Sequence, residues 1–148
     1  MIPQVDQSIK IENTSQDTVL ALANDISSSV IVPASVKRIC LQELRERGIQ
    51  GNPAVLRIFA AALFLLIEKK LPGLEHIAID KEYPGHDSQI KSMLMNWIRR
   101  SRPRFDPANI TFIHVGKRSP AHRQAIGIVR GKALPERVLT VDEIMALL

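Results

Sequence analysis

The chain has one cysteine, Cys40, so it can form no intrachain disulfide and no zinc site built on several cysteines. Aromatic residues make up only 4% of the 148 residues, too few for a row of rings on which single-stranded bases stack. No uninterrupted apolar run approaches the roughly 20 residues of a membrane helix, and no basic start leads into an apolar stretch. The sequence therefore predicts a cytoplasmic protein without a membrane partner.

What is present is the composition of an ordinary globular protein. Apolar residues make up 45% and charged residues 24% of the chain. A chain of this length can bury one core of its own. We expect a polar N-terminal arm or edge strand over residues 1–16 and a single α/β domain over residues 17–148.

The hydrophobic pattern predicts strands that alternate with helices. Helical spacing places Cys40 on the buried face of a helix over 36–47 and Lys37 on its polar face. Asn24-Asp25 is typical of a turn between two strands. The alternation predicts a mixed sheet with an N-terminal hairpin and helices packed on it. Strands are expected over 18–23, 28–32, 76–80 and 110–115, and helices over 36–47, 52–70, 87–100, from 120 onward and from 140 onward.

Positive charge is concentrated in one part of the chain. Residues 91–137 contain eleven Lys or Arg and two acidic residues, whereas the whole chain has a net charge of +5. Such a concentration is typical of phosphate contacts, and equally of a solvated basic face. The residues expected to bind nucleic acid or another anion are Arg99, Arg100, Arg102, Arg104, Lys117, Arg118, Ser119 and Arg123.

An acidic cluster follows the strand expected over 76–80. Asp80 stands where that strand ends, and Glu82 and Asp87 follow within eight residues. Carboxylate oxygens are ligands for hard divalent ions, so Asp80 and Glu82 are candidate catalytic ligands for Mg²⁺ or Mn²⁺ in phosphodiester hydrolysis. The alternative is structural: Asp80 stabilises the loop, Glu82 pairs with a nearby basic residue, and Asp87 caps the next helix.

A basic loop, Gly116–His122, joins the strand expected over 110–115 to the next helix. Lys117 and Arg118 carry charge, and Ser119-Pro120 is typical of a helix start, whose free N–H groups attract anions. His122 is a candidate acid or base near neutral pH. The loop lacks the spacing of a Walker motif. In the alternative interpretation, Ser119 is an ordinary cap and His122 lies on the surface.

The order of elements from Asn52 to about Gly131 resembles the ribonuclease H-like superfamily. In that family a helix precedes a strand that ends in a metal-binding aspartate, and a further helix, a strand and a histidine-containing loop follow. The resemblance implies that Asp80 matches the strand aspartate and His122 the loop histidine. The family also carries an aspartate in its first strand and an acidic residue in the helix. The strand expected over 18–23 has no such aspartate, and the helix over 52–70 has Arg57 in its first turns instead of an acidic residue. The family layout also has a third strand where the helix over 36–47 is expected here.

The sequence leaves three functions open. The first is a metal-dependent nuclease that uses Asp80, Glu82 and His122. The second is a nucleic-acid-binding module without catalysis, and the third is a domain that binds a small anion or a protein. The number of subunits, and the choice between DNA and RNA, do not follow from the sequence.

Overall fold

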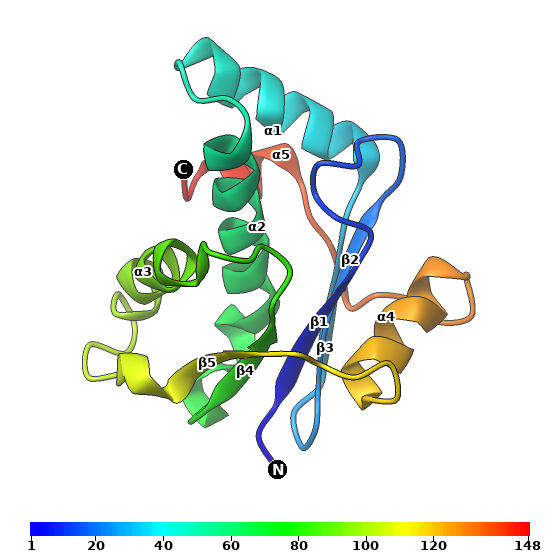
Figure 1. Cartoon of the computed structure of the whole chain (residues 1–148), viewed down its shortest axis with the longest axis vertical. Coiled ribbons are helices and arrows are strands. Elements are labelled where there is room, and N and C mark those ends of the chain that lie inside the picture. The colour runs from blue at the N-terminus through cyan, green and yellow to red at the C-terminus, as the bar shows by residue number, and fades with distance from the viewer.

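The computed structural model describes residues 1–148 as an α/β fold built on one six-stranded mixed sheet (Figure 1). The strands are β1 (Gln4–Ser8), β2 (Thr18–Ala23), β3 (Ser28–Val32), β4 (Ile77–Asp80), β5 (Ile110–Ile113) and β6 (Arg137–Val138). Their order across the sheet is β5-β4-β1-β2-β3-β6. β1, β2 and β3 pair antiparallel, whereas β4, β5 and β6 join the sheet in parallel pairs. The predicted fold class is confirmed.

β1 corrects the interpretation of the N-terminus. A loose arm or edge strand over residues 1–16 is wrong for Gln4–Ser8, which lies between β2 and β4 in the middle of the sheet. A polar strand can occupy this place because most of its buried polar atoms have partners, although Nε2 of Gln7 has none. Asp6 contacts the ring of His122, and Gln7 accepts a hydrogen bond from the hydroxyl of Tyr83. Polarity therefore does not mark β1 as lying outside the domain.

The predicted hairpin of β2 and β3 is confirmed. Asn24 and Asp25 in its turn both have positive φ, 86° and 61°. Their short polar side chains make this left-handed conformation more acceptable than it is for most residues.

The predicted helices are present as well. Ser119 and Thr140 cap the last two, and Thr140 forms a capping box with Glu143. The helices are α1 (Ala34–Glu46), α2 (Asn52–Ile67), α3 (Asp87–Ile98), α4 (Pro120–Val129) and α5 (Val141–Met145).

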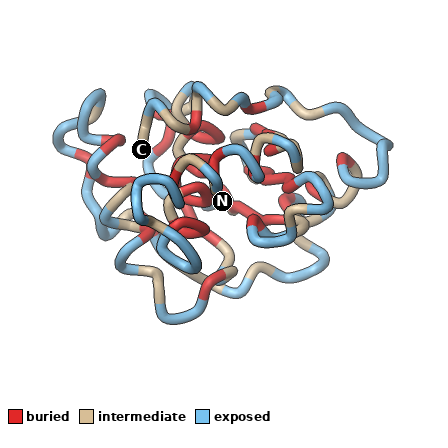
Figure 2. The backbone as a smooth tube through the Cα atoms, turned by 90° about the horizontal axis from the view of Figure 1, so that it is seen from above, coloured by how far each residue is buried: buried red, intermediate tan, exposed pale blue.

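Helices cover both faces of the sheet. α1, α2, α3 and α5 lie on one face over a core of 34 buried residues, and α4 lies on the other (Figure 1). α2 is apolar nearly all round because the sheet and its neighbouring helices enclose it. Figure 2 shows the buried segments at the centre of the molecule, within a shell of exposed loops. No helix combines the length and the apolar character that crossing a membrane requires.

The parallel pairing determines where polar residues can meet. β1, β4 and β5 are parallel neighbours, so their carboxyl ends share one edge of the sheet. Asp80 ends β4 at this edge, and its Oδ1 accepts a hydrogen bond of 2.7 Å from the amide of Val115, just beyond β5. The carboxyl edge is also where α/β sheets usually bind ligands.

Candidate metal centre

Asp6 and Asp80 lie side by side on neighbouring strands. Val5 of β1 pairs with Ile79 of β4, so the next residue in each strand is a carboxylate. Side chains alternate between the two faces of a sheet, and Val5 and Ile79 both belong to the core under α2. The two aspartates therefore face the side of the sheet that carries α4.

Glu82 joins them from the loop that follows β4. Its amide donates a hydrogen bond of 2.9 Å to the carbonyl of Asp80, which turns the chain back toward the strand end. Lys10 holds the loop from the other side, because its Nζ donates to the Glu82 carbonyl at 3.0 Å. Tyr83 anchors the next position by accepting a hydrogen bond of 3.2 Å from the amide of Ile11.

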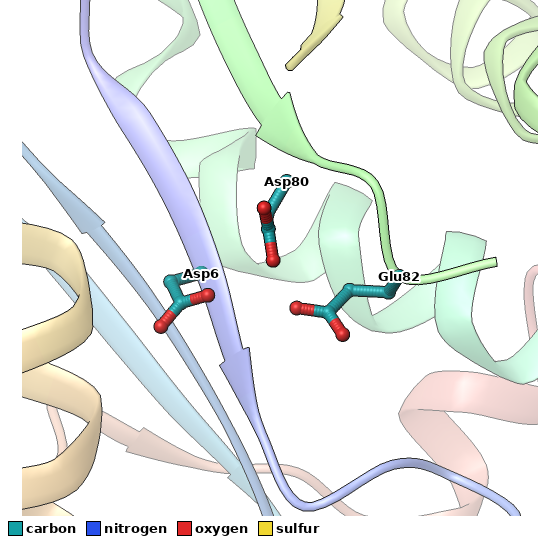
Figure 3. A group of neighbouring side chains, drawn as sticks. All are labelled: Asp6, Asp80 and Glu82. Atoms are coloured by element: carbon teal, nitrogen blue, oxygen red, sulfur yellow. The ribbon is translucent and has the colours of Figure 1, made fainter. Parts of the chain in front are cut away.

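The three side chains form one cluster, named here the carboxylate centre (Asp6, Asp80 and Glu82). One carboxylate oxygen from each residue lies within 4.8 Å of the other two. Figure 3 shows the three groups pointing toward a common space from β1, the end of β4 and the following loop. The donors are all oxygens and include no sulfur or nitrogen, the set that Mg²⁺ and Mn²⁺ prefer.

Burial and mutual repulsion raise the pKa values of two of these groups. Burial is the main cause of the raised pKa of Glu82, about 8, with Asp80 and then Asp6 adding to it. The pKa of Asp6 is raised chiefly by burial, against a hydrogen bond from His122 that lowers it. Carboxylates gathered in this way retain a proton or take up a cation to offset the repulsion.

The carboxylate centre suits a divalent ion in size as well as in chemistry. Oxygens around octahedral Mg²⁺ are about 3–4 Å apart, given metal–oxygen distances of about 2.1 Å. The three oxygens of the carboxylate centre all lie within 4.8 Å of one another, close to that spacing. Asp6, Asp80 and Glu82 would be the ligands, and water or substrate oxygens would complete the shell.

His122 links the carboxylate centre to α4. Its Nδ1 lies 2.7 Å from Oδ2 of Asp6, and its side chain keeps 29% of its surface exposed. The amide of His122 also donates to Oγ of Ser119 at 3.1 Å, so Ser119 is an ordinary N-cap, as in the structural alternative. The carboxylate of Asp6 can accept a proton from Nδ1, and Nε2 forms no hydrogen bond within the chain.

The basic loop (Gly116–His122) reaches the carboxylate centre, as its position after β5 predicts. Lys117 and Arg118 are exposed and form no ion pair within the chain, and the same holds for Arg123 on α4. These three positive side chains are therefore free to meet an external anion.

The four arginines after α3 lie elsewhere. α3 begins after the loop that follows β4, and Arg99 comes directly after its last residue. The guanidinium of Arg102 donates to the carbonyls of Leu71 and Leu74 and lies 3.6 Å from Glu75, just before β4 begins. The structure thus places Arg102 away from the carboxylate centre, and the binding of an anion by Arg99, Arg100, Arg102 and Arg104 stays a prediction. The two basic groups of this stretch are separated in space because β5 carries the chain from the arginines that follow α3 to the basic loop at the carboxyl edge.

Asp6 is the residue that the sequence did not reveal as a candidate. Its neighbours are polar, and β1 owes its burial to strands and loops that arrive from distant parts of the chain. The ribonuclease H-like resemblance contains one signal that points to Asp6. That family has an aspartate in its first strand, and Asp6 is the first aspartate of the chain.

Comparisons with protein-family models, with curated proteins and with solved structures find no match to this chain. What the molecule does is therefore inferred from the carboxylate centre, from the charges beside it and from the sheet that holds them.

Proposed function

We propose that the chain is a divalent-metal-dependent phosphodiesterase that acts on nucleic acid. The observation that carries the proposal is the carboxylate centre, in which oxygens from two strands and a loop meet within 4.8 Å. Asp6, Asp80 and Glu82 would hold Mg²⁺ or Mn²⁺. When bound, the cation supplies Lewis-acid assistance to phosphodiester hydrolysis.

The neighbouring side chains supply what such a reaction needs besides the cation. Lys117 and Arg118 attract a phosphate toward the carboxyl edge, since no acid in the chain neutralises them. Asp6 orients the ring of His122 through the contact of 2.7 Å, which leaves Nε2 to accept or donate a proton. Lys10 and Tyr83 keep the Glu82 loop in place.

The ribonuclease H-like resemblance supports the same proposal. With β1 as the first strand, that strand carries an aspartate, Asp6, and β3 becomes the third strand that the family layout requires. α2 still lacks the acidic residue that the family has in its helix. Glu82 brings a third carboxylate to the centre from the loop after β4 instead.

The substitution Asp80→Asn tests the proposal. It keeps the size of the side chain and removes the charge between Asp6 and Glu82, so we expect Mg²⁺- or Mn²⁺-dependent cleavage of a labelled oligonucleotide to fall at least a hundredfold. Asp106→Asn is the matched control. Asp106 accepts a hydrogen bond of 2.9 Å from the amide of Ala108 before β5, and asparagine can accept the same bond.

Two results would overturn the proposal. One is cleavage that persists unchanged in Asp80→Asn. The other is a wild-type protein that binds the oligonucleotide in a salt-dependent manner and cleaves it with neither Mg²⁺ nor Mn²⁺. That second result would favour a binding module, in which each phosphate that the protein neutralises on a single strand adds about 0.7 to the log–log salt slope.

A further inference from the structure

A cleft of about 490 Å³ opens where α2 and α3 begin, named here the α2–α3 cleft. Apolar contact comes from Leu56 and Met93, and hydrogen-bonding groups surround it. This mixture of a few polar groups and apolar walls is typical of sites for small organic ligands, and the volume falls within their usual range of about 300–1,000 Å³. The polar side chains that line it are Asn52, Arg57, His86, Ser88, Gln89 and Ser92.

The charge of the α2–α3 cleft favours an anionic ligand. Arg57 is half-buried on α2 and forms no ion pair within the chain. No residue that lines the cleft is acidic. An arginine without a carboxylate partner, on the wall of a cleft of this size, is suited to a phosphate, because its planar group donates two parallel hydrogen bonds.

Hydrogen-bonding groups in the same cleft can recognise a base or a sugar. Nδ1 of His86 lies 2.9 Å from Oε1 of Gln89, which leaves the NH₂ group of that amide without a partner in the chain. Asn52 adds a second amide, and Ser88 and Ser92 add hydroxyl groups. Amides paired with hydroxyls can hydrogen-bond the edge of a nucleobase or the hydroxyls of a sugar.

The α2–α3 cleft shares lining residues with a second hollow that reaches Glu82. That hollow, of about 200 Å³, is lined by Glu82, Glu12 and Lys10 among others. Asn52, Leu56 and His86 line both hollows. A chain-like ligand whose phosphate lies at Glu82 would therefore enter the α2–α3 cleft with its next unit.

We propose that the α2–α3 cleft binds one nucleotide of the nucleic-acid strand that the carboxylate centre cleaves, with Arg57 on its phosphate. This inference rests on the proposed function and adds the direction in which the strand runs: from the basic loop across Glu82 toward α2 and α3. It also makes the substrate single-stranded at this point, because one nucleotide that occupies the cleft cannot remain stacked in a duplex.

Steady-state cleavage of a 12-nucleotide single strand, in ribo and deoxyribo forms, tests the inference. The variants are Arg57→Gln, which removes the charge, and Ser92→Phe, which fills the cleft from an exposed position on α3. We expect KM to rise about tenfold in Arg57→Gln, the cost of losing a charged hydrogen bond, and to rise in Ser92→Phe because the ring occupies the space of the nucleotide, while kcat stays within twofold in both. Arg130→Gln is the matched control, because it removes the same charge from an exposed arginine that follows α4, on the other face of the sheet.

The outcomes separate the two proposals. If the wild-type protein cleaves the strand but KM is unchanged in both variants, or rises equally in Arg130→Gln, the inference is wrong and the proposed function stands. If the wild-type protein cleaves no strand with Mg²⁺ or Mn²⁺, both fail, and the variants are not needed to show it. Thermal unfolding of each variant checks that it is folded. If Arg57→Gln is not folded, the KM of Ser92→Phe alone decides whether the inference holds.

Discussion

The metal-free protein should become less stable as the pH rises, and the substitution Glu82→Gln should remove most of this pH dependence. In the folded state, burial and then the neighbouring aspartates raise the pKa of Glu82 from 4.5 to about 8. The unfolded chain releases the same proton near pH 4.5, so between pH 4.5 and 8 the folded state binds more protons than the unfolded state. The free energy of unfolding must therefore fall as the pH rises through this window.

The size of the fall follows from the pKa. Moving it from 4.5 to about 8 corresponds to at most about 5 kcal/mol, at 1.36 kcal/mol for each pH unit. Glu82 is only partly buried, so water and salt screen part of this interaction. We therefore expect the free energy of unfolding to fall by about 2 kcal/mol between pH 5 and 8. For a chain of 148 residues, that is a decrease in Tm of about 6 °C.

Thermal unfolding followed by circular dichroism in EDTA, at constant ionic strength, measures this slope. Glu82→Gln should flatten it, whereas Glu46→Gln, on the exposed side of α1, should keep the wild-type slope. Mn²⁺ should restore stability at pH 8, by about 2.7 kcal/mol at a hundredfold excess over its Kd, and much less at pH 5. Equal slopes in wild type and Glu82→Gln, or no effect of Mn²⁺ or Mg²⁺ on Tm at pH 8, would refute the reasoning.

Two further predictions follow from contacts away from Glu82. Lys37→Ala should lower the free energy of unfolding, measured by urea denaturation, by about 3 kcal/mol. The reason is that it removes a fully buried side chain whose Nζ donates to the Asn13 carbonyl and to Oγ1 of Thr18. A loss below about 1 kcal/mol would contradict this. The double variant Lys117→Gln/Arg118→Gln should reduce the log–log salt slope of single-strand binding by about 1.4, measured by fluorescence anisotropy. Arg99→Gln/Arg100→Gln should leave that slope unchanged, and an equal reduction in both would show that the location of the charge does not matter.

The local elements could be predicted because their signals are short-range. Spacing of apolar residues identified α1 and α2, and the turn at Asn24-Asp25 identified the β2–β3 hairpin. Ser119 and Thr140 marked helix starts through hydrogen bonds that span only three residues. Each of these features depends on residues within one or two turns, so the sequence alone contains the needed information.

Features that depend on distant packing could not be predicted in the same way. Lys37 has the position of a surface residue in the helical pattern, but the loop between β1 and β2 folds over it and supplies carbonyl acceptors. Burial lowers its pKa to about 8 despite these partners. The same loop carries Lys10, which holds Glu82. A polar segment expected to be an arm thus supplies a strand of the sheet and one wall of the candidate site.

The contact between Asp6 and His122 joins residues 116 positions apart, and it exists because of a small apolar cluster on the α4 face of the sheet. Ala121, Ala125 and Ile128 recur at intervals of four and three, so they form the buried side of α4 against β1 and β2. Alanine at two of these positions allows the helix to lie close to the strands. His122 follows Ala121 directly, which places its ring at the margin of the buried side, within reach of β1. Small side chains on α4 therefore position His122, the acid–base group of the proposed site, whereas the register of the strands positions only the carboxylates.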